Sequence, residues 1–158
     1  MTTLQTTPLA AVLDLENLLH TARGVSPAAV RTQFLEIAAW VHALGEVRYA
    51  VGCCDYWLAK ILAPVAAEAG VRIFPGPIGR DRADGELLRR AADIPDSAEV
   101  LIVGSGDRAF AGLLADQALA GRRTVVIGRS RSIATALRAA AHHVIELADP
   151  AAAVRRAA

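Results

Sequence analysis

Short runs of consecutive apolar residues alternate along the chain with longer segments in which apolar residues recur every three or four positions. The run at residues 100–103 has no polar alternation, which is typical of a strand covered on both faces of a parallel sheet. Similar runs predict further strands at residues 9–13, 47–54, 71–74, 124–127 and 144–147.

The segments between these strands have helical spacing and recognisable ends. Ser26 followed by Pro27 predicts the start of a long amphipathic helix over residues 26–44. We expect further helices over residues 56–69, 83–92, 110–120 and 133–141. Gly70 and Gly121 would end the first and third of these, and Pro64 would kink or interrupt the first.

Strands and helices that alternate so regularly predict an α/β fold. We expect a doubly wound, mostly parallel sheet of about five strands with helices on both faces. Residues 9–149 would form a single domain, preceded by a disordered N-terminus at residues 1–8 and followed by an Ala-rich tail at residues 150–158. In such a sheet the first strand is central, and a crevice opens where it neighbours a later strand.

Composition agrees with a compact fold and excludes several classes of protein. Of the 158 residues, 54% are hydrophobic and 21% charged, and the net charge of +1 predicts no strong general attraction to nucleic acid. No apolar stretch approaches the roughly 20 residues of a membrane-spanning helix, and residues 1–8 resemble no targeting peptide, so we expect a cytoplasmic protein. The adjacent Cys53 and Cys54 are expected to be core thiols, and the Ala-rich helices make a homodimer plausible.

Acidic residues follow several of the predicted strands. Asp14 ends the first strand and Asp107 follows the fourth, while Asp84 begins a helix after the third and Asp55 follows the second. The carboxyl ends of parallel strands meet at one edge of the sheet, so these carboxylates would face a common crevice. They would repel one another unless a cation such as Mg2+ or Mn2+ neutralised them.

Three motifs at these positions resemble the signatures of the NYN family of PIN-like nucleases. They are Asp14-Leu15-Glu16-Asn17, Gly79-Arg80-Asp81-Arg82-Ala83-Asp84 and Ser105-Gly106-Asp107-Arg108-Ala109-Phe110. The resemblance covers nearly the whole chain and implies a metal-dependent ribonuclease that hydrolyses RNA phosphodiester bonds. It assigns catalysis and the binding of Mg2+ or Mn2+ to Asp14, Asp84 and Asp107.

The same resemblance implies substrate-binding roles for neighbouring polar residues. Asn17 and Ser105 would orient the site or a phosphate. Independently of the resemblance, the charge of Arg80 and Arg82 would let them bind phosphate, or they would merely flank a loop. The chain departs from the family at two places where an acid is frequent, because it has Ala109 and Arg90 there. A catalytically degenerate domain that binds RNA or a protein partner is therefore the alternative.

Several of these residues also have purely structural interpretations. Asp14 could end its strand as an Asx-turn while Asn17 caps the next helix, and Asp107 could cap the helix after its own strand. Trp40 and Trp57 are expected in the core, although Trp57 or Tyr56 could instead stack on a base.

Two other classes of protein share part of this pattern. Gly104-x-Gly106-x-x-Ala109 with the later Arg129 mimics a dinucleotide-binding fingerprint, but it lies too late in the chain for a first βαβ unit. A phospho-acceptor domain needs a basic side chain near its aspartate, and Lys60, the only lysine, is misplaced for that role.

Overall fold

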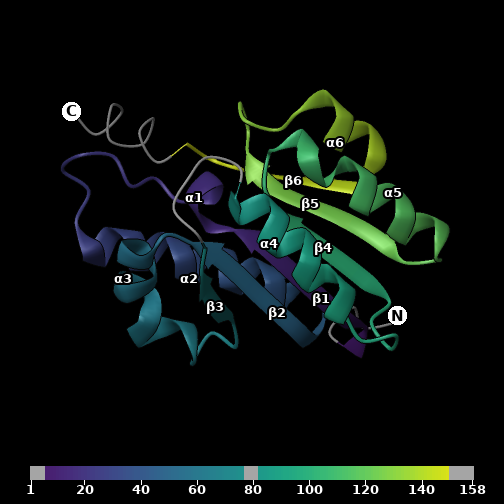
Figure 1. The fold of residues 1–158 in the computed structure, drawn as a ribbon, viewed down its shortest axis with the longest axis horizontal. Helices are drawn as coiled ribbons and strands as arrows, with labels where there is room; N and C mark the ends of the chain where they lie inside the picture. Colours follow the sequence, from purple (N-terminus) through teal and green to yellow (C-terminus); the bar gives the residue numbers. More distant parts are fainter. Residues whose placement is uncertain (1–5, 77–81, 150–158) are drawn as a thin grey trace.

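A six-stranded parallel sheet forms the centre of the protein (Figure 1). The computed structural model describes residues 6–76 and 82–149. The strands are β1 (Pro8–Asp14), β2 (Glu46–Cys54), β3 (Arg72–Pro75), β4 (Val100–Gly104), β5 (Arg123–Arg129) and β6 (His143–Leu147). Their order is β3-β2-β1-β4-β5-β6, and all five pairings are parallel. The predicted fold class is confirmed, with the short last strand as a full member of the sheet.

Helices cover both faces of this sheet. They are α1 (Leu15–Leu18), α2 (Pro27–Ala43), α3 (Tyr56–Ala66), α4 (Arg82–Arg90), α5 (Ala111–Leu119) and α6 (Thr135–Ala140), with short 3-10 turns η2 (Ala91–Asp93) and η3 (Arg108–Phe110). Side chains of α1, α2 and α3 belong to one hydrophobic core, and those of α4, α5 and α6 to the other. The chain therefore changes faces between β3 and β4.

The strand β1 shows why the sheet needs helices on both sides. Leu9, Ala11 and Leu13 point into the core under α2, whereas Ala10 and Val12 point into the core under α4 and α5. Each is fully buried. A run that is apolar at every position is stable only where both faces exclude water, because burial of one large aliphatic side chain contributes about 1.5–3 kcal/mol.

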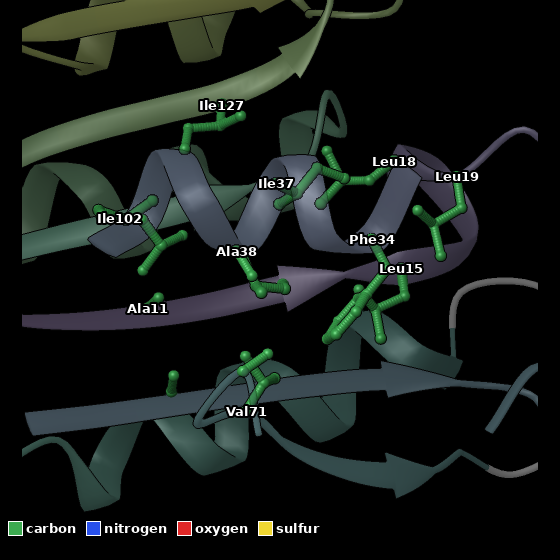
Figure 2. Close-up of a cluster of buried hydrophobic side chains, with 14 of the residues drawn as sticks. Ala11, Leu15, Leu18, Leu19, Phe34, Ile37, Ala38, Val71, Ile102 and Ile127 are labelled. Carbon is green, nitrogen blue, oxygen red and sulfur yellow. The ribbon is translucent and has the colours of Figure 1, made fainter. Parts of the chain in front are cut away.

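The helix α2 covers the middle of one face. Its Phe34, Ile37 and Ala38 face strand residues that include Ala11 and Ile102 (Figure 2). Ser26 caps the helix by accepting a hydrogen bond from the Ala29 amide at 3.1 Å, as the sequence predicts.

Other helix ends differ from the prediction by a few residues. The helix α3 continues through Pro64 as far as Ala66, and a turn then leads to Gly70, whose φ of 70° is the left-handed conformation expected after a helix. The helices α4, α5 and α6 are each shorter than predicted, and a 3-10 turn follows α4 and another precedes α5. The four-residue helix α1 is not anticipated by the sequence pattern at all.

Candidate functional site at the carboxyl edge of the sheet

Asp14 occupies the end of the central strand β1. Its side chain is only 6% exposed, and it caps α1 by accepting a hydrogen bond from the Asn17 amide to Oδ1 at 3.4 Å. Its other oxygen, Oδ2, accepts a hydrogen bond from the Ser105 hydroxyl at 3.1 Å. Asp14 therefore acts as a helix N-cap rather than in the expected Asx-turn, because its bond is to the amide three residues on. The carboxylate lies inside a polar cluster contributed by both β1 and the end of β4.

The loop after β4 interlocks with α1. Ser105 is fully buried, and its hydroxyl oxygen also accepts a hydrogen bond from the Asp107 amide at 3.1 Å. The Gly106 amide donates to Oδ1 of Asn17 at 2.8 Å. The alternative in which Asn17 caps the following helix is wrong, because Asp14 caps α1, Ser26 caps α2 and the Asn17 side chain holds the β4 loop.

Gly106 is required at its position by close packing. A Cβ atom added there would lie 2.1 Å from the carbonyl oxygen of Ser132. The Gly106 carbonyl also accepts a hydrogen bond from the Ala134 amide at 2.9 Å. The loop is thus held between α1 and the segment before α6, and this fixes the direction of Ser105 and Asp107.

Asp107 and Asp84 line a cavity of about 510 Å³. Asp107 is partly buried and caps η3 by accepting a hydrogen bond from the Ala109 amide at 2.9 Å, as the capping interpretation predicts. Asp84 lies in the first turn of α4 and is 8% exposed. The same cavity is lined by Gly85, Leu88, Arg108 and Ala109.

The electrostatics of Asp14 show that these carboxyl groups interact. Burial raises the pKa of Asp14 above its ordinary value, and the negative charge of Asp107 raises it further. Hydrogen bonds donated by Ser105 and by the Asn17 amide oppose this rise in the pKa, and so does a side-chain interaction with Asp84. Asp14 is therefore close enough to both Asp84 and Asp107 to interact with each of them.

A further pair of acids extends the cluster toward β2, which pairs with β1 in the register Asp14 to Cys53. The pKa of Glu16 is raised by burial, by a hydrogen bond and charge interaction with Asp55, and by the charge of Asp14. Glu16 was not among the expected site residues. An acid two residues beyond a strand-end aspartate is the signal that could have identified it.

Two expected substrate-binding arginines are not placed. Arg80, like Asp81, lies outside the described residues, and Arg82 begins α4 but its side chain is outside the described part. Arg108, which was not singled out, lines the site cavity and supplies a cation there.

The two departures from the family pattern differ in position. Ala109 lines the site cavity, so an acid is missing from its wall. Arg90 lies elsewhere, with its guanidinium 3.5 Å from the centroid of the Phe74 ring and 2.8 Å from Glu86.

Other expectations about single residues have mixed outcomes. Cys53 and Cys54 are buried free thiols, as predicted. The expectation that both tryptophans are core residues is wrong, because Trp40 is 46% exposed and Trp57 56% exposed. Each lies on the outer side of a helix whose other side carries the aliphatic contacts with the sheet.

Arg129, the residue that mimics a dinucleotide contact, uses its hydrogen-bond donors within the protein. Its guanidinium donates to the carbonyls of Leu18 and Ala148, both at 2.7 Å, and to Oε1 of Gln33 at 3.3 Å. These bonds give Arg129 a structural role.

A larger cavity of about 880 Å³ opens at the opposite, amino edge of the sheet, between residues that include Glu99 and Arg123. One of its cations, Arg122, already donates to the carbonyls of Pro95 and Ala98. We therefore place the candidate site at the smaller cavity, which Asp84 and Asp107 line.

The donor set at this site suits a hard divalent cation, because carboxylate and hydroxyl oxygens are the ligands that Mg2+ and Mn2+ prefer. Within residues 6–76 and 82–149, however, no group of three or more His, Cys, Asp or Glu side chains is arranged so that it could hold a metal ion. The chemistry of the donors thus fits a metal, while their arrangement is not a closed ligand set.

Comparisons with known proteins identify a family and a fold. The model of the NYN domain family matches residues 8–148. No curated protein matches the chain. Among solved structures, a protein of unknown function from Vibrio parahaemolyticus RIMD 2210633 is similar, with a TM-score of 0.66 and 18% identity over 94% of this chain and 98% of that one. This likeness shows a shared fold. None of the helices within the described residues is both long and apolar enough to cross a membrane.

Proposed function

Because the chain belongs to the NYN domain family, generally a nuclease-like domain, we propose that it is a metal-dependent ribonuclease that hydrolyses RNA phosphodiester bonds. The observation that supports this most directly is the convergence of Asp84 and Asp107 on the buried Asp14. Burial of a carboxylate beside other carboxylates costs free energy, and a bound cation offsets that cost. We propose that Mg2+ or Mn2+ binds at these three residues with water or phosphate oxygens completing its shell, because within the described residues the carboxylates do not form a closed ligand set by themselves.

A divalent ion at this position would activate water and stabilise the charge on phosphate oxygens during an in-line displacement. The residues of the chain would hold and orient the site. Ser105 fixes one oxygen of Asp14 by donating a hydrogen bond, and the Asn17 amide fixes the other. Arg108, exposed at the cavity wall, would contact a phosphate of the substrate.

The alternative is an RNA- or protein-binding domain without catalysis. Ala109 in the wall of the cavity favours it, because one carboxylate is missing there. A single metal ion needs fewer carboxylates than a pair of ions about 3.5–4 Å apart, so we propose a one-metal site.

The test is cleavage of single-stranded and structured RNA with Mn2+, Mg2+ or EDTA. Asp14→Asn and Asp107→Asn keep the shape of each side chain and remove its charge. Asp96→Asn is a matched control, because Asp96 is an exposed acid at the amino edge of the sheet.

We expect cleavage that needs the metal, that both site variants lose by at least about 100-fold, and that the control retains. Equal cleavage by all four proteins would indicate a contaminating nuclease and contradict the proposal. RNA binding without cleavage by the wild type would favour the degenerate domain.

A further inference from the structure

Two exposed aromatic side chains lie at the start of α3, at the same carboxyl edge of the sheet as the candidate site. Tyr56 is 67% exposed and Trp57 56% exposed, although the chain has only two tryptophans and two tyrosines. Leaving a large apolar side chain in water forgoes about 1.5–3 kcal/mol of burial free energy. Leu58 and Leu62 form the buried side of the same helix, so Tyr56 and Trp57 lie on its side toward solvent.

The position of this pair relative to the acids follows from the sheet. The strand β2 pairs with β1, and α3 begins directly after β2, at the same edge of the sheet as α1 (Figure 1). Asp55 caps α3 by accepting a hydrogen bond from the Leu58 amide at 2.8 Å, and it also interacts with Glu16. Glu16 in turn feels the charge of Asp14. Glu16 therefore lies between the residue before Tyr56, with which it is hydrogen-bonded, and Asp14, whose charge it senses.

Cations lie on the side of the aromatic pair away from the acids. Lys60, the only lysine, places its ammonium 5.5 Å from the centroid of the Tyr56 ring. Because residues three and four apart are neighbours on a helix, Lys60 lies next to both Tyr56 and Trp57. The Arg31 guanidinium on α2 lies at the next residue of α3, where it donates to the Ile61 carbonyl at 3.5 Å.

We propose that Tyr56, Trp57 and Lys60 bind an unpaired stretch of RNA at the carboxyl edge of the sheet, with bases stacked on the two aromatic rings and a backbone phosphate paired with Lys60. Flat exposed rings next to a cation are the combination that single-stranded nucleic acid uses, because every base has a face that stacks and every nucleotide a phosphate. A base-paired strand cannot offer its faces in this way. The inference rests on the proposed function for the choice of RNA, and it adds a binding surface for the strand at the start of α3.

The two tryptophans allow a direct test by fluorescence, carried out in EDTA so that the RNA stays intact. Trp40→Phe leaves Trp57 as the only tryptophan, and Trp57→Phe leaves Trp40 as the only one. Trp40 is a matched control, since it is similarly exposed but lies in the last turns of α2, toward the start of β2. The probes are a 12-nucleotide oligouridylate and a blunt RNA duplex.

We expect the oligouridylate to quench the fluorescence of Trp40→Phe and to leave that of Trp57→Phe unchanged. Trp57→Ala should weaken oligouridylate binding about 5- to 100-fold, as loss of one stacked base predicts, while Trp40→Ala stays within about twofold. Lys60→Gln should lower the slope of log affinity against log salt by about 0.7, the effect of one lost phosphate contact on a single strand. The duplex should bind more weakly than the single strand and lose little affinity in Trp57→Ala.

Equal quenching of both single-tryptophan proteins, or unchanged affinity in Trp57→Ala, would overturn the proposal. If Trp57→Ala altered the sedimentation of the protein but not its RNA affinity, the aromatic pair would instead be a protein interface. Failure of the nuclease proposal would look different, because the wild type would bind the oligouridylate through Trp57 yet not cleave it when Mn2+ is added.

Discussion

Ser105 shows how one side chain organises the candidate site. It donates to Oδ2 of Asp14 and accepts from the amide of Asp107, and it is fully buried. Both of its bonds are made with residues on which the proposed function depends. A buried hydroxyl without hydrogen-bond partners would lower the free energy of unfolding by about 1–3 kcal/mol. Burial of Ser105 is therefore tolerated because both aspartates supply its partners.

Asp14 is expected to reduce the stability of the protein. The variant Asp14→Asn keeps the oxygen that caps α1 and removes a buried charge next to Asp107. Its Nδ2 replaces the oxygen that accepts from Ser105, so the serine hydroxyl must turn to accept a hydrogen bond there, which offsets part of the gain. In EDTA we expect this variant to have a melting temperature about 2–4 °C above that of the wild type, equivalent to about 1 kcal/mol for a chain of this length. The measurement is thermal unfolding followed by circular dichroism.

The pH dependence of this gain follows from the raised pKa. The unfolded carboxyl titrates near the ordinary value of 3.8, and the folded one above it. Between these two pKa values the folded state binds more protons than the unfolded state, so the free energy of unfolding of the wild type falls as the pH rises. The advantage of Asp14→Asn should therefore be small near pH 3.8 and full near neutral pH. An advantage that shrinks as the pH rises would contradict this account.

Gly106 is expected to tolerate no side chain. The Cβ of Gly106→Ala would lie 2.1 Å from a backbone oxygen, so the loop or the segment around Ser132 must move. We expect a loss of stability of about 1–3 kcal/mol and loss of the proposed cleavage. Gly112→Ala is the control, because nothing lies within 4 Å of its Cβ in α5 and alanine favours helices. It should be neutral or stabilise the protein by up to about 1 kcal/mol.

At the scale of elements, Arg129 connects parts of the chain that do not otherwise pair. It extends from the end of β5 to the end of α1, to α2 through Gln33, and to the segment after β6. Gln33 also bonds both backbone groups of His20, at 2.7 and 3.0 Å. The segment between α1 and α2 is held by this network of polar contacts.

Shortening Arg129 should therefore loosen these connections. Arg129→Lys keeps the charge but cannot donate to three acceptors in the same directions, and we expect a loss of about 1–3 kcal/mol in urea unfolding. The exposed Arg131, two residues later, is the control, and Arg131→Lys should change stability by less than about 0.5 kcal/mol. Equal effects of the two substitutions would contradict the structural role of Arg129.

The elements also show what the sequence could and could not predict. Apolar runs predicted all six strands, because a strand buried on both faces is apolar at every position. The helix α1 was missed because four residues are too few to show helical periodicity, and its start depends on the side chain of Asp14. The positions of Asp14, Asp84 and Asp107 after predicted strands were enough to predict that they lie at one edge of the sheet. Glu16 belongs to the same acidic cluster through its contact with Asp55, which the sequence does not show.

The sequence pattern also could not predict that Trp57 is exposed. Its residue type predicts burial, and only the direction in which the first turn of α3 faces decides otherwise. The structural use of Arg129 likewise depends on carbonyl groups that are distant in the sequence.

For the molecule as a whole, the strand order places the site. The chain changes faces between β3 and β4, and β4 then pairs with β1 in parallel. As a result Ser105 meets Asp14 across 91 positions of sequence. In an open parallel sheet, ligands bind in the crevice at the carboxyl ends of the strands where the strand order reverses. Here that position lies between β1 and β4.

The binding of a cation at that place should stabilise the whole fold. Mg2+ or Mn2+ at about 100 times its dissociation constant would add about 2.7 kcal/mol, or about 5–10 °C in melting temperature for a chain of this length. We expect this shift in the wild type and in Asp96→Asn, and its loss in Asp14→Asn and Asp107→Asn. Because the measurement needs no RNA, it separates metal binding from catalysis. A shift of equal size in all four proteins would place the cation away from the carboxyl edge of the sheet, whereas a shift confined to proteins with Asp14 and Asp107 would mean that the fold is most stable with the repulsion among its carboxylates neutralised.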